Sequence, residues 1–265
     1  MSKELLSENE RTFILQGITT QSGIRLDGRG NEQVRRKDVQ VNPVAQAMGS
    51  CRVTLQDTCH GTDVLVAIKG EIVQDASQSG IKVVLESSNF AELREERNSV
   101  MAQWFTRLFK ESKCIDAECL VILEDRFFWS LTAEVLIISD LGGGLFDCVG
   151  LGLKEALNGC RLPHVQVEVG GESEALTVSD DPSLSRAVQA TQFPGCCEVG
   201  VISGEANCFL IDMSMAEEEC CQCTFWAALH PHTGKVFCIE QVGNDALLDP
   251  QVIPQVLSRA LANLK

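Results

Sequence analysis

The 265-residue chain lacks a hydrophobic run long enough to cross a membrane. Its most apolar stretches, such as Leu65–Ile68 and Val135–Ile138, are far shorter than the roughly 20 residues that a transmembrane helix needs. The sequence also has no Gly-X-Y repeat and no sustained heptads, which excludes a fibrous protein. The first residues, Met1–Glu4, are polar, so we expect neither a secretion signal nor a transit peptide. These absences predict a soluble intracellular protein.

Basic residues are scarce as well. The chain has 22 Lys and Arg against 37 Asp and Glu, and its net charge is −15. From Leu162 onward only four basic residues face fourteen acidic ones. A stand-alone nucleic-acid-binding protein usually carries a broad basic face, so the composition argues against that class. A polyanion would meet the N-terminal half of the chain, or a groove that another subunit completes.

Complete catalytic and nucleotide-binding motifs are missing too. There is no Walker A sequence, no Gly-x-Ser-x-Gly elbow and no His-Glu-x-x-His helix, and the run Gly142–Asp147 lacks the third glycine of a dinucleotide fingerprint. The Gly142–Gly144 turn between a predicted strand and helix could still present backbone N–H groups to an anion. The commoner structure for such a loop is a tight turn that needs positive φ and begins a helix. We therefore expect no cofactor and no self-sufficient active site.

Metal-binding motifs are incomplete. The 13 cysteines are odd in number and lie in apolar surroundings, which indicates reduced core thiols rather than a disulfide framework. Cys220–Cys223 and His230–His232 carry ligand types that suit zinc. No second Cys-x-x-Cys pair accompanies them, and Cys220–Cys223 falls within a predicted helix. We expect buried thiols on that helix and no metal site.

The chain does contain a series of short strand and helix patterns. Runs rich in Val, Ile and Thr predict strands over Val34–Val41, Ser50–Leu55, Thr62–Val73, Ile81–Leu85, Cys119–Leu123, Phe127–Ser139, Cys197–Ile202, Cys208–Asp212 and Lys235–Val242. Capping signals and apolar residues at helical spacing predict a short helix after Ser7 and helices over Phe90–Phe109, Leu145–Leu157, about Met215–Leu229 and Pro250–Leu264. Such a mixture predicts an α+β fold with mostly antiparallel sheets covered by helices.

The loop signals divide the chain. Residues 163–194 are rich in them and predict a hinge between two β-sheet/α-helix halves. The expected organisation is an N-terminal helical extension over residues 1–23, a first half over residues 24–165 and a C-terminal half over residues 190–264.

Several segments together resemble the RNase PH family. The resemblance rests on Ile24–Arg29, on Arg35 shortly after it, on Gly49-Ser50 at the start of a strand, on Thr62–Glu71, on Cys208–Glu219 and on Val242-Gly243-Asn244. It runs from about Arg25 to about Leu264, with Gln56–His60 similar to a small insertion in a strand turn. It implies an RNase PH-like fold, which is similar to the fold of domain 2 of ribosomal protein S5.

The resemblance implies that the chain has lost the groups that phosphorolysis needs. Phosphorolytic members of the family hold inorganic phosphate with a Gly-Thr-Arg or Gly-Ser-Arg turn, which aligns with Gly142–Gly144, so the hydroxyl and the guanidinium are missing. Their catalytic Asp aligns with Thr224. Losing the phosphate clamp and the acid would cost several orders of magnitude in rate. We expect a catalytically silent protein, and the alternative is an active phosphate-dependent 3′–5′ exoribonuclease.

Within the family the chain is most similar to a ring subunit of the RNA exosome, because of Gly142–Asp147 and the helix that ends at Lys154–Leu157. This similarity implies a hexameric channel built with homologous RNase PH-like subunits, topped by S1/KH cap subunits, that threads single-stranded RNA for 3′–5′ degradation and rRNA processing. It implies no membrane partner, and a location in the nucleus, nucleolus and cytoplasm.

Two basic residues are candidate RNA contacts. Thr106–Ser112 resembles a segment with which the inactive subunit of archaeal relatives presents basic residues to the active one. Arg107 and Lys110 occupy its basic positions. Residues spaced i, i+3 share one face of a helix, so both side chains could neutralise RNA phosphates together. A solvated helix end would have the same pattern.

Overall fold

The computed structural model describes residues 6–20, 23–55, 61–87, 92–170, 173–188, 193–202, 208–243 and 250–264. Gln56–His60 and Asn244, which entered the family resemblance, lie outside these residues. In the described residues, no helix is long and apolar enough to span a membrane.

The first half of the chain forms a mixed sheet. Its strands are β1 (Lys37–Val41), β2 (Gly49–Leu55), β3 (Thr62–Val73), β4 (Gly80–Ser87), β5 (Val121–Leu123) and β6 (Phe127–Asp140). They lie in the order β1-β2-β3-β6-β4, with β5 paired to β6, and only the β4–β6 pair is parallel. The prediction of mostly antiparallel strands in this half is confirmed.

The second half forms a four-stranded antiparallel sheet in the order β12-β11-β13-β14. Its strands are β11 (Gly195–Ile202), β12 (Cys208–Ile211), β13 (Cys223–Leu229) and β14 (Val236–Val242). Two further pairs of strands come between the halves in the sequence. One is the short pair β7 (Arg161–Leu162) and β10 (Arg186–Ala187), and the other is the ribbon of β8 (Val165–Gly170) and β9 (Ser173–Val178).

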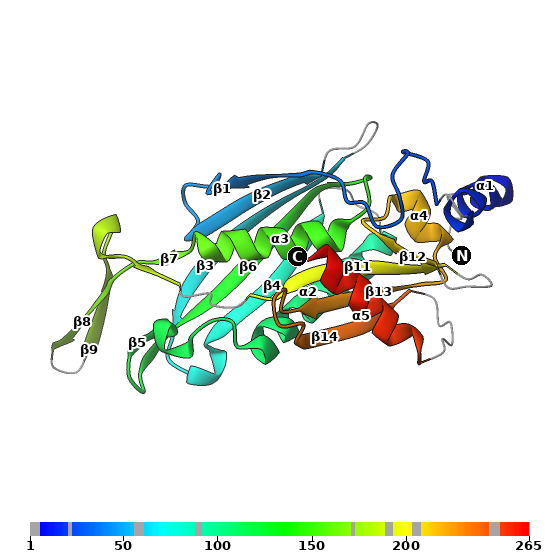
Figure 1. The fold of residues 1–265 in the computed structure, drawn as a ribbon. Coiled ribbons are helices and arrows are strands. Elements are labelled where there is room, and N and C mark those ends of the chain that lie inside the picture. Colours follow the sequence, from blue (N-terminus) through cyan, green and yellow to red (C-terminus); the bar gives the residue numbers. More distant parts are fainter. Residues whose placement is uncertain are drawn as a thin grey trace.

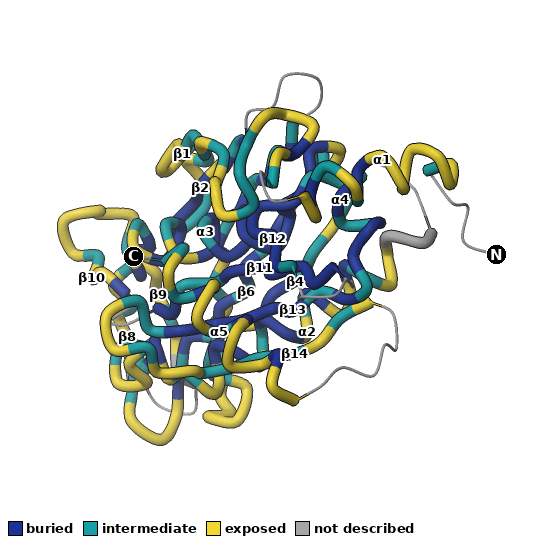
Figure 2. Tube along the Cα trace, turned by 45° about the vertical axis from the view of Figure 1, so that its right-hand side comes forward, coloured by how far each residue is buried: buried dark blue, intermediate teal, exposed yellow. Residues whose placement is uncertain are grey.

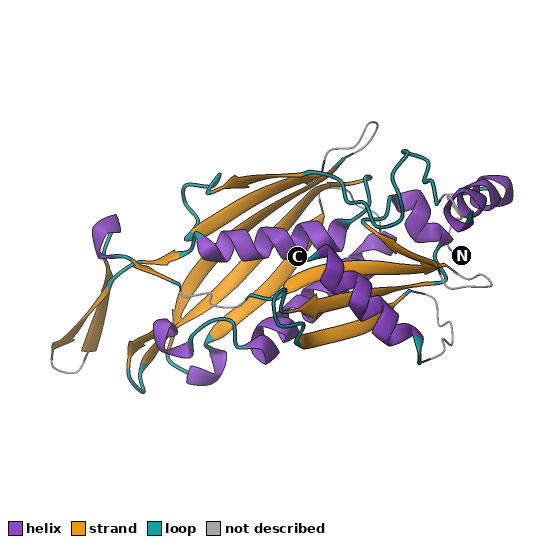
Figure 3. Cartoon of the chain, in the orientation of Figure 1, coloured by secondary structure: helices purple, strands orange, loops and turns teal. Residues whose placement is uncertain are grey.

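Helices fill the space between the sheets and cover their outer parts (Figures 1 and 3). They are α1 (Glu8–Thr19), α2 (Glu92–Ser112), α3 (Leu145–Asn158), α4 (Met215–Cys220) and α5 (Val252–Asn263). The main core joins the inner faces of both sheets to α2 and α3, a second cluster packs α5 against the four-stranded sheet, and a third packs α1 against α4. The α+β prediction of two sheet-and-helix halves is therefore confirmed.

The centre of the molecule is a group of aromatic rings. Phe146 of α3 stacks on Trp226 of β13 with ring centroids 5.0 Å apart, and Trp104 of α2 meets Phe146 edge-on at 4.9 Å. Such pairs stabilise a core beyond the area that they bury. Figure 2 shows the buried stretches gathered around α3 and β11, with exposed loops at the periphery. One core therefore holds elements of both halves together.

Two expectations about secondary structure were wrong. The helix expected over Met215–Leu229 ends at Cys220, and Cys223–Leu229 is instead the strand β13. All but one residue of β13 is buried, because the sheet has packed layers on both faces, and a continuous apolar run does not distinguish such a strand from a buried helix. The loop-rich stretch expected over residues 163–194 contains the β8–β9 ribbon.

Candidate functional site

The triple-glycine turn joins the end of β6 to the start of α3. Gly143 and Gly144 have φ values of 71° and 62°, in the left-handed region that favours glycine. A Cβ atom on Gly143 would also lie against the backbone carbonyl oxygen of Met213, closer than van der Waals contact permits. The expected tight turn with positive φ at the start of a helix is confirmed.

The protein's own carboxylate lies at the N-terminus of α3. The backbone N–H of Gly144 donates to Oε1 of Glu218 at 3.1 Å, and Glu218 comes from the first turn of α4. The other carboxylate oxygen of Glu218 accepts from Nη1 of Arg97 on α2, also at 3.1 Å. A helix N-terminus attracts anions through its free N–H groups and its dipole. Here Glu218 already supplies that negative charge.

Cations around the turn are paired with acidic groups or carbonyls. Arg35 donates to Oδ1 of Asp212 at 2.6 Å and to the carbonyl oxygen of Gly142 at 2.6 Å. Lys37 lies 3.6 Å from the carboxylate of Asp147, in the first turn of α3. Burial raises the pKa of Asp147, although Lys37 and a hydrogen bond from the backbone N–H of Glu198 favour its charged form. The turn therefore lies in a network whose charges balance one another.

Glu198 of β11 has one carboxyl oxygen that this network leaves unsatisfied. Its Oε1 accepts from the indole N–H of Trp226 at 3.0 Å and lies 3.5 Å from Nη2 of Arg97. Its Oε2 is buried and has no hydrogen-bond partner among the described residues. Burial and the negative charge of Glu218 raise the pKa of Glu198 to about 8. Glu198 therefore keeps a proton at neutral pH, which removes one negative charge from the interior.

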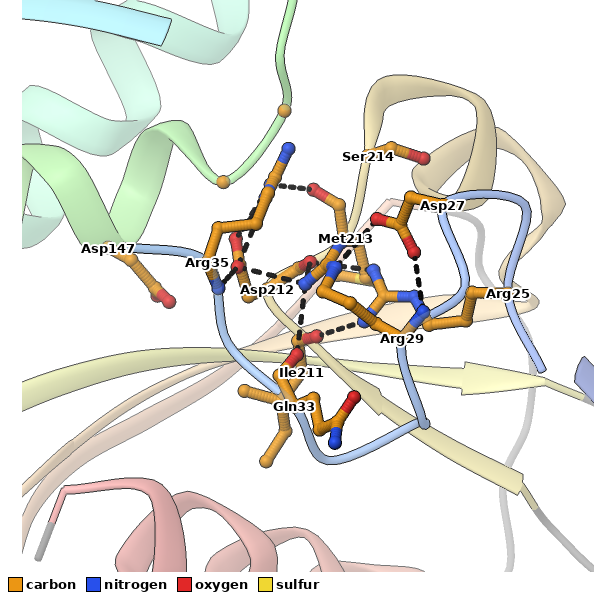
Figure 4. A network of polar contacts seen from close by, with 12 residues as sticks. Arg25, Asp27, Arg29, Gln33, Arg35, Asp147, Ile211, Asp212, Met213 and Ser214 are labelled. Carbon is orange, nitrogen blue, oxygen red and sulfur yellow. Dashed lines mark hydrogen bonds and ion pairs between the residues drawn. The ribbon is translucent and has the colours of Figure 1, made fainter. Parts of the chain in front are cut away.

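Three arginines of the N-terminal segment bind the loop after β12 (Figure 4). Arg25 donates to the carbonyl oxygens of Ile211 and Asp212 at 2.9 and 2.7 Å and forms a buried ion pair with Glu217. Arg29 lies 3.0 Å from the carboxylate of Asp212. Burial alone would raise the pKa of Asp212, but the hydrogen bonds and charge of Arg35 outweigh it and hold that pKa below its usual range. The resemblance segment Ile24–Arg29 thus joins the first half of the chain to the second.

Thr224 takes the position that the resemblance assigns to a catalytic Asp. It is the second residue of β13, and its hydroxyl donates to the carbonyl oxygen of Val242 at 3.1 Å. A hydroxyl held in this way is no acid at neutral pH, so Thr224 offers no replacement for a carboxyl group.

Arg107 and Lys110 lie in the last two turns of α2 and are exposed, as the helical spacing predicts. Arg107 forms an ion pair with Glu240 of β14 and a hydrogen bond with Sγ of Cys238 at 3.4 Å. These contacts attach the basic face of α2 to the edge of the four-stranded sheet. The pair is separate from the network at the triple-glycine turn, since Arg97 and Arg107 are ten positions apart and a helix rises 1.5 Å per residue.

The cysteine and histidine segments are distributed over several elements. Cys220 ends α4, Cys221 caps it, and Cys223 begins β13, so the thiols are buried as expected but do not share one helix. His230 and His232 have ring centroids 5.9 Å apart in the turn before β14. Across the described residues, no group of three or more His, Cys, Asp or Glu side chains could hold a metal ion.

Sequence reasoning missed the contacts of Glu198 and Glu218. In the sequence, Glu218 stands out only as part of the resemblance segment Cys208–Glu219, and Glu198 belongs to no motif. The one available signal is a carboxylate inside the apolar run Cys197–Ile202, because charged residues are rarely buried without partners.

Comparison with known proteins gives consistent matches. Residues 33–163 match the family described as RNase_PH, the 3′ exoribonuclease family, domain 1. The chain is 32% identical to the exosome complex component Rrp42 of Thermococcus kodakarensis, over 68% of this chain and 70% of the relative. It is 25% identical to a protein of Dictyostelium discoideum named putative exosome complex exonuclease RRP42, over 96% and 93% of the two chains.

Solved structures share the fold. A chain of an archaeal exosome core superimposes with a TM-score of 0.76 at 21% identity, covering 97% of this chain and 93% of that one. Rrp46 of rice superimposes with a TM-score of 0.62 at 15% identity, covering 91% and 94%. The family model and the relative from Thermococcus kodakarensis confirm the resemblance inferred from the sequence motifs, and the chain belongs to the RNase PH family.

Proposed function

We propose that this chain is a non-catalytic ring subunit of an RNA exosome core. The observation that carries the proposal is the hydrogen bond from the Gly144 N–H to Glu218, which fills the N-terminus of α3 with the protein's own carboxylate. An attacking phosphate would have to displace Glu218, whose other carboxylate oxygen is held by Arg97. Electrostatic stabilisation of the transferred group is a large part of catalysis, and here the N–H group that would supply it is already bound to Glu218.

The second support is the absence of proton-transfer chemistry at Thr224. A hydroxyl with a pKa far above neutral cannot replace a carboxyl group as general acid. The names of the relatives, exosome complex component Rrp42, support placement in such an assembly. The proposed role is to build the channel that guides RNA for 3′–5′ degradation and rRNA processing.

Release of nucleoside diphosphates tests this proposal. Purified chain is incubated with single-stranded RNA and inorganic phosphate, and products are separated by chromatography, with an active family member as the positive control. We expect no nucleoside diphosphate above the protein-free background. Release that scales with the concentration of this chain would instead support the alternative, an active phosphate-dependent 3′–5′ exoribonuclease.

The proposed partners are homologous RNase PH-like ring subunits, S1/KH cap subunits and single-stranded RNA within the assembled pore. An acidic exterior with a few basic residues on one helix end suits RNA that is held only inside a multi-subunit channel. The proposed location is the nucleus, the nucleolus and the cytoplasm, which imaging of the tagged protein checks directly.

Arg107 and Lys110 are the proposed RNA contacts in that pore. Replacing both with Glu should weaken RNA retention by the assembled ring and leave assembly intact, because both side chains are exposed. Each lost phosphate contact should also reduce the salt dependence of binding by about one unit of log–log slope. Lys154→Glu, an exposed change on α3, is the matched control. If the double variant binds RNA with unchanged affinity and protects the same length of RNA, Arg107 and Lys110 are not RNA contacts.

The ion pair of Arg107 with Glu240 gives a second test of the same contact. RNA has to compete with Glu240 for this guanidinium. Glu240→Gln should therefore tighten RNA binding by about twofold to fivefold, in line with the small free energy of an exposed ion pair. Weaker binding by the Gln variant would show that Arg107 acts only within its own chain.

A further inference from the structure

The β8–β9 ribbon lies between the two halves in the sequence, and it projects from the end of the molecule beyond the first sheet, on the left of Figures 1 and 3. Its two strands pair antiparallel with each other, and within the described residues neither pairs with any other strand. A two-stranded ribbon on its own is marginally stable in water. Covering one face of the ribbon would therefore stabilise it.

The pairing register makes the ribbon amphipathic. Val167 lies opposite Leu176, while Gln166 lies opposite Thr177 on the other face. The next apolar pair toward the body is Val165 and Val178, on the same face as Val167 and Leu176.

The apolar face of the ribbon contacts the core only at its base. Val165 packs against the main core. Its partner across the ribbon, Val178, is 44% exposed, and further out Val167 and Leu176 belong to none of the hydrophobic clusters formed by the described residues. An apolar strip thus continues outward from the core without a covering element from the described part of this chain.

The charge of the ribbon restricts what can cover it. Residues 164–185 contain five Asp and Glu and no Lys or Arg. Such a segment repels RNA and anionic lipid, so neither polyanion is a suitable partner. An apolar face on a segment of acidic composition matches a protein groove that is apolar at its centre and rimmed by Lys and Arg.

We propose that the Val167–Leu176 face of the ribbon docks in an apolar, basic-rimmed groove of the neighbouring RNase PH-like subunit. This inference rests on the proposed function, because it requires a ring. In a ring, each subunit contacts its two neighbours through two different surfaces. A ribbon that projects on one side can therefore contact the neighbour on that side. In this chain 18 of the 22 Lys and Arg precede Leu162. A homologue with the same uneven distribution of Lys and Arg would present its basic N-terminal half to the acidic ribbon segment.

Two matched double variants test the docking face. Val167→Ser with Leu176→Ser makes the apolar face polar, and Gln166→Ala with Thr177→Ala changes the opposite face at the same step of the ladder. Each variant is co-expressed with the homologous ring subunits, and the affinity for each neighbour is measured after purification. The thermal melting of the free chains shows whether the ribbon substitutions disturb the body of the protein.

We expect the Ser variant to bind one neighbour at least about tenfold more weakly and the Ala variant to bind like wild type, because a few buried apolar anchors dominate such interfaces. Asp180→Lys reverses one exposed charge of the acidic segment over residues 164–185. It should weaken the same contact and reduce the sensitivity of that contact to salt.

The outcomes separate this inference from the proposed function. If the wild-type chain assembles into the ring and the Ser variant does so with unchanged affinity for every neighbour, the docking face is refuted while the ring role stands. If the wild-type chain binds no homologous subunit, both are refuted. Equal weakening by the Ser and Ala variants would also overturn the inference, since the effect would then not depend on the apolar face.

Discussion

Replacing Glu198 with Gln should remove a pH-dependent loss of stability. The carboxyl group of Glu198 is buried among Arg97 of α2, Asp147 of α3, Glu218 of α4 and Trp226 of β13. Two carboxylates, Glu198 and Glu218, share the single guanidinium of Arg97, and one oxygen of Glu198 has no hydrogen-bond partner among the described residues. A proton on that oxygen relieves the repulsion, and Gln provides a permanently neutral group of nearly the same shape.

The size of the effect follows from the difference in proton binding between the folded and unfolded states. The pKa of Glu198 is about 8 in the folded protein, against an ordinary value of 4.5. Between these values the folded state holds a proton that the unfolded chain has released, so the free energy of unfolding falls as pH rises through that window. One pKa unit corresponds to about 1.4 kcal/mol. Between pH 4.5 and pH 7 the wild-type chain should therefore lose about 3 kcal/mol through this group.

Urea unfolding at several pH values measures this loss. The intrinsic fluorescence of the three tryptophans reports unfolding, because Trp104, Trp129 and Trp226 are all buried. The other titrating groups are common to both proteins, so the difference between Glu198→Gln and wild type isolates Glu198. We expect the variant to gain stability relative to wild type steadily from pH 5 to pH 8. Parallel curves over that range would refute the reasoning.

Other substitutions test the packing and the ion pairs around the triple-glycine turn. Gly143→Ala should lower the free energy of unfolding by more than about 2 kcal/mol, because the new methyl group meets the backbone near Met213 in addition to the left-handed strain. Gly28→Ala has similar positive φ and open space around it, so calorimetry should show only about 1 kcal/mol for this control. Glu217→Ala leaves Arg25 buried without its partner and should cost about 3–5 kcal/mol by urea denaturation; a loss below 1 kcal/mol would contradict that assignment.

Local patterns were sufficient for much of the fold. The helix α1 begins where the Ser7 and Glu10 capping box predicts, and both reciprocal hydrogen bonds are present. In β3 the alternation of buried and less buried residues along Thr62–Ile68 is the period-2 pattern of a strand with one covered face. These signals act over a few residues, so they can be recognised without knowing the tertiary structure.

The errors occurred where the tertiary environment decides the structure. Cys223–Leu229 is an apolar run that suits a buried helix or a buried strand, and its pairing with β11 and β14 makes it a strand. The ribbon was missed although Val165, Val167 and Val169 alternate with polar residues, because the surrounding Gly, Ser, Asp and Pro residues indicate loops.

The candidate site was predicted only in part. Through the family resemblance, the glycines at the turn and Thr224, all visible in the sequence, imply that the phosphate-binding groups and the catalytic acid are missing. The contact of Gly144 with Glu218 joins residues 74 positions apart, so no local spacing could reveal it. The same holds for the ion pair between Arg107 and Glu240, which are 133 positions apart.

Native mass spectrometry of this chain co-expressed with homologous ring subunits tests the central claim most directly. The account predicts one copy of the chain in a closed complex with different RNase PH-like subunits, and no nucleoside diphosphate when the chain alone meets RNA and phosphate. A stable ring made of this chain alone that shortens RNA in the presence of phosphate would contradict it.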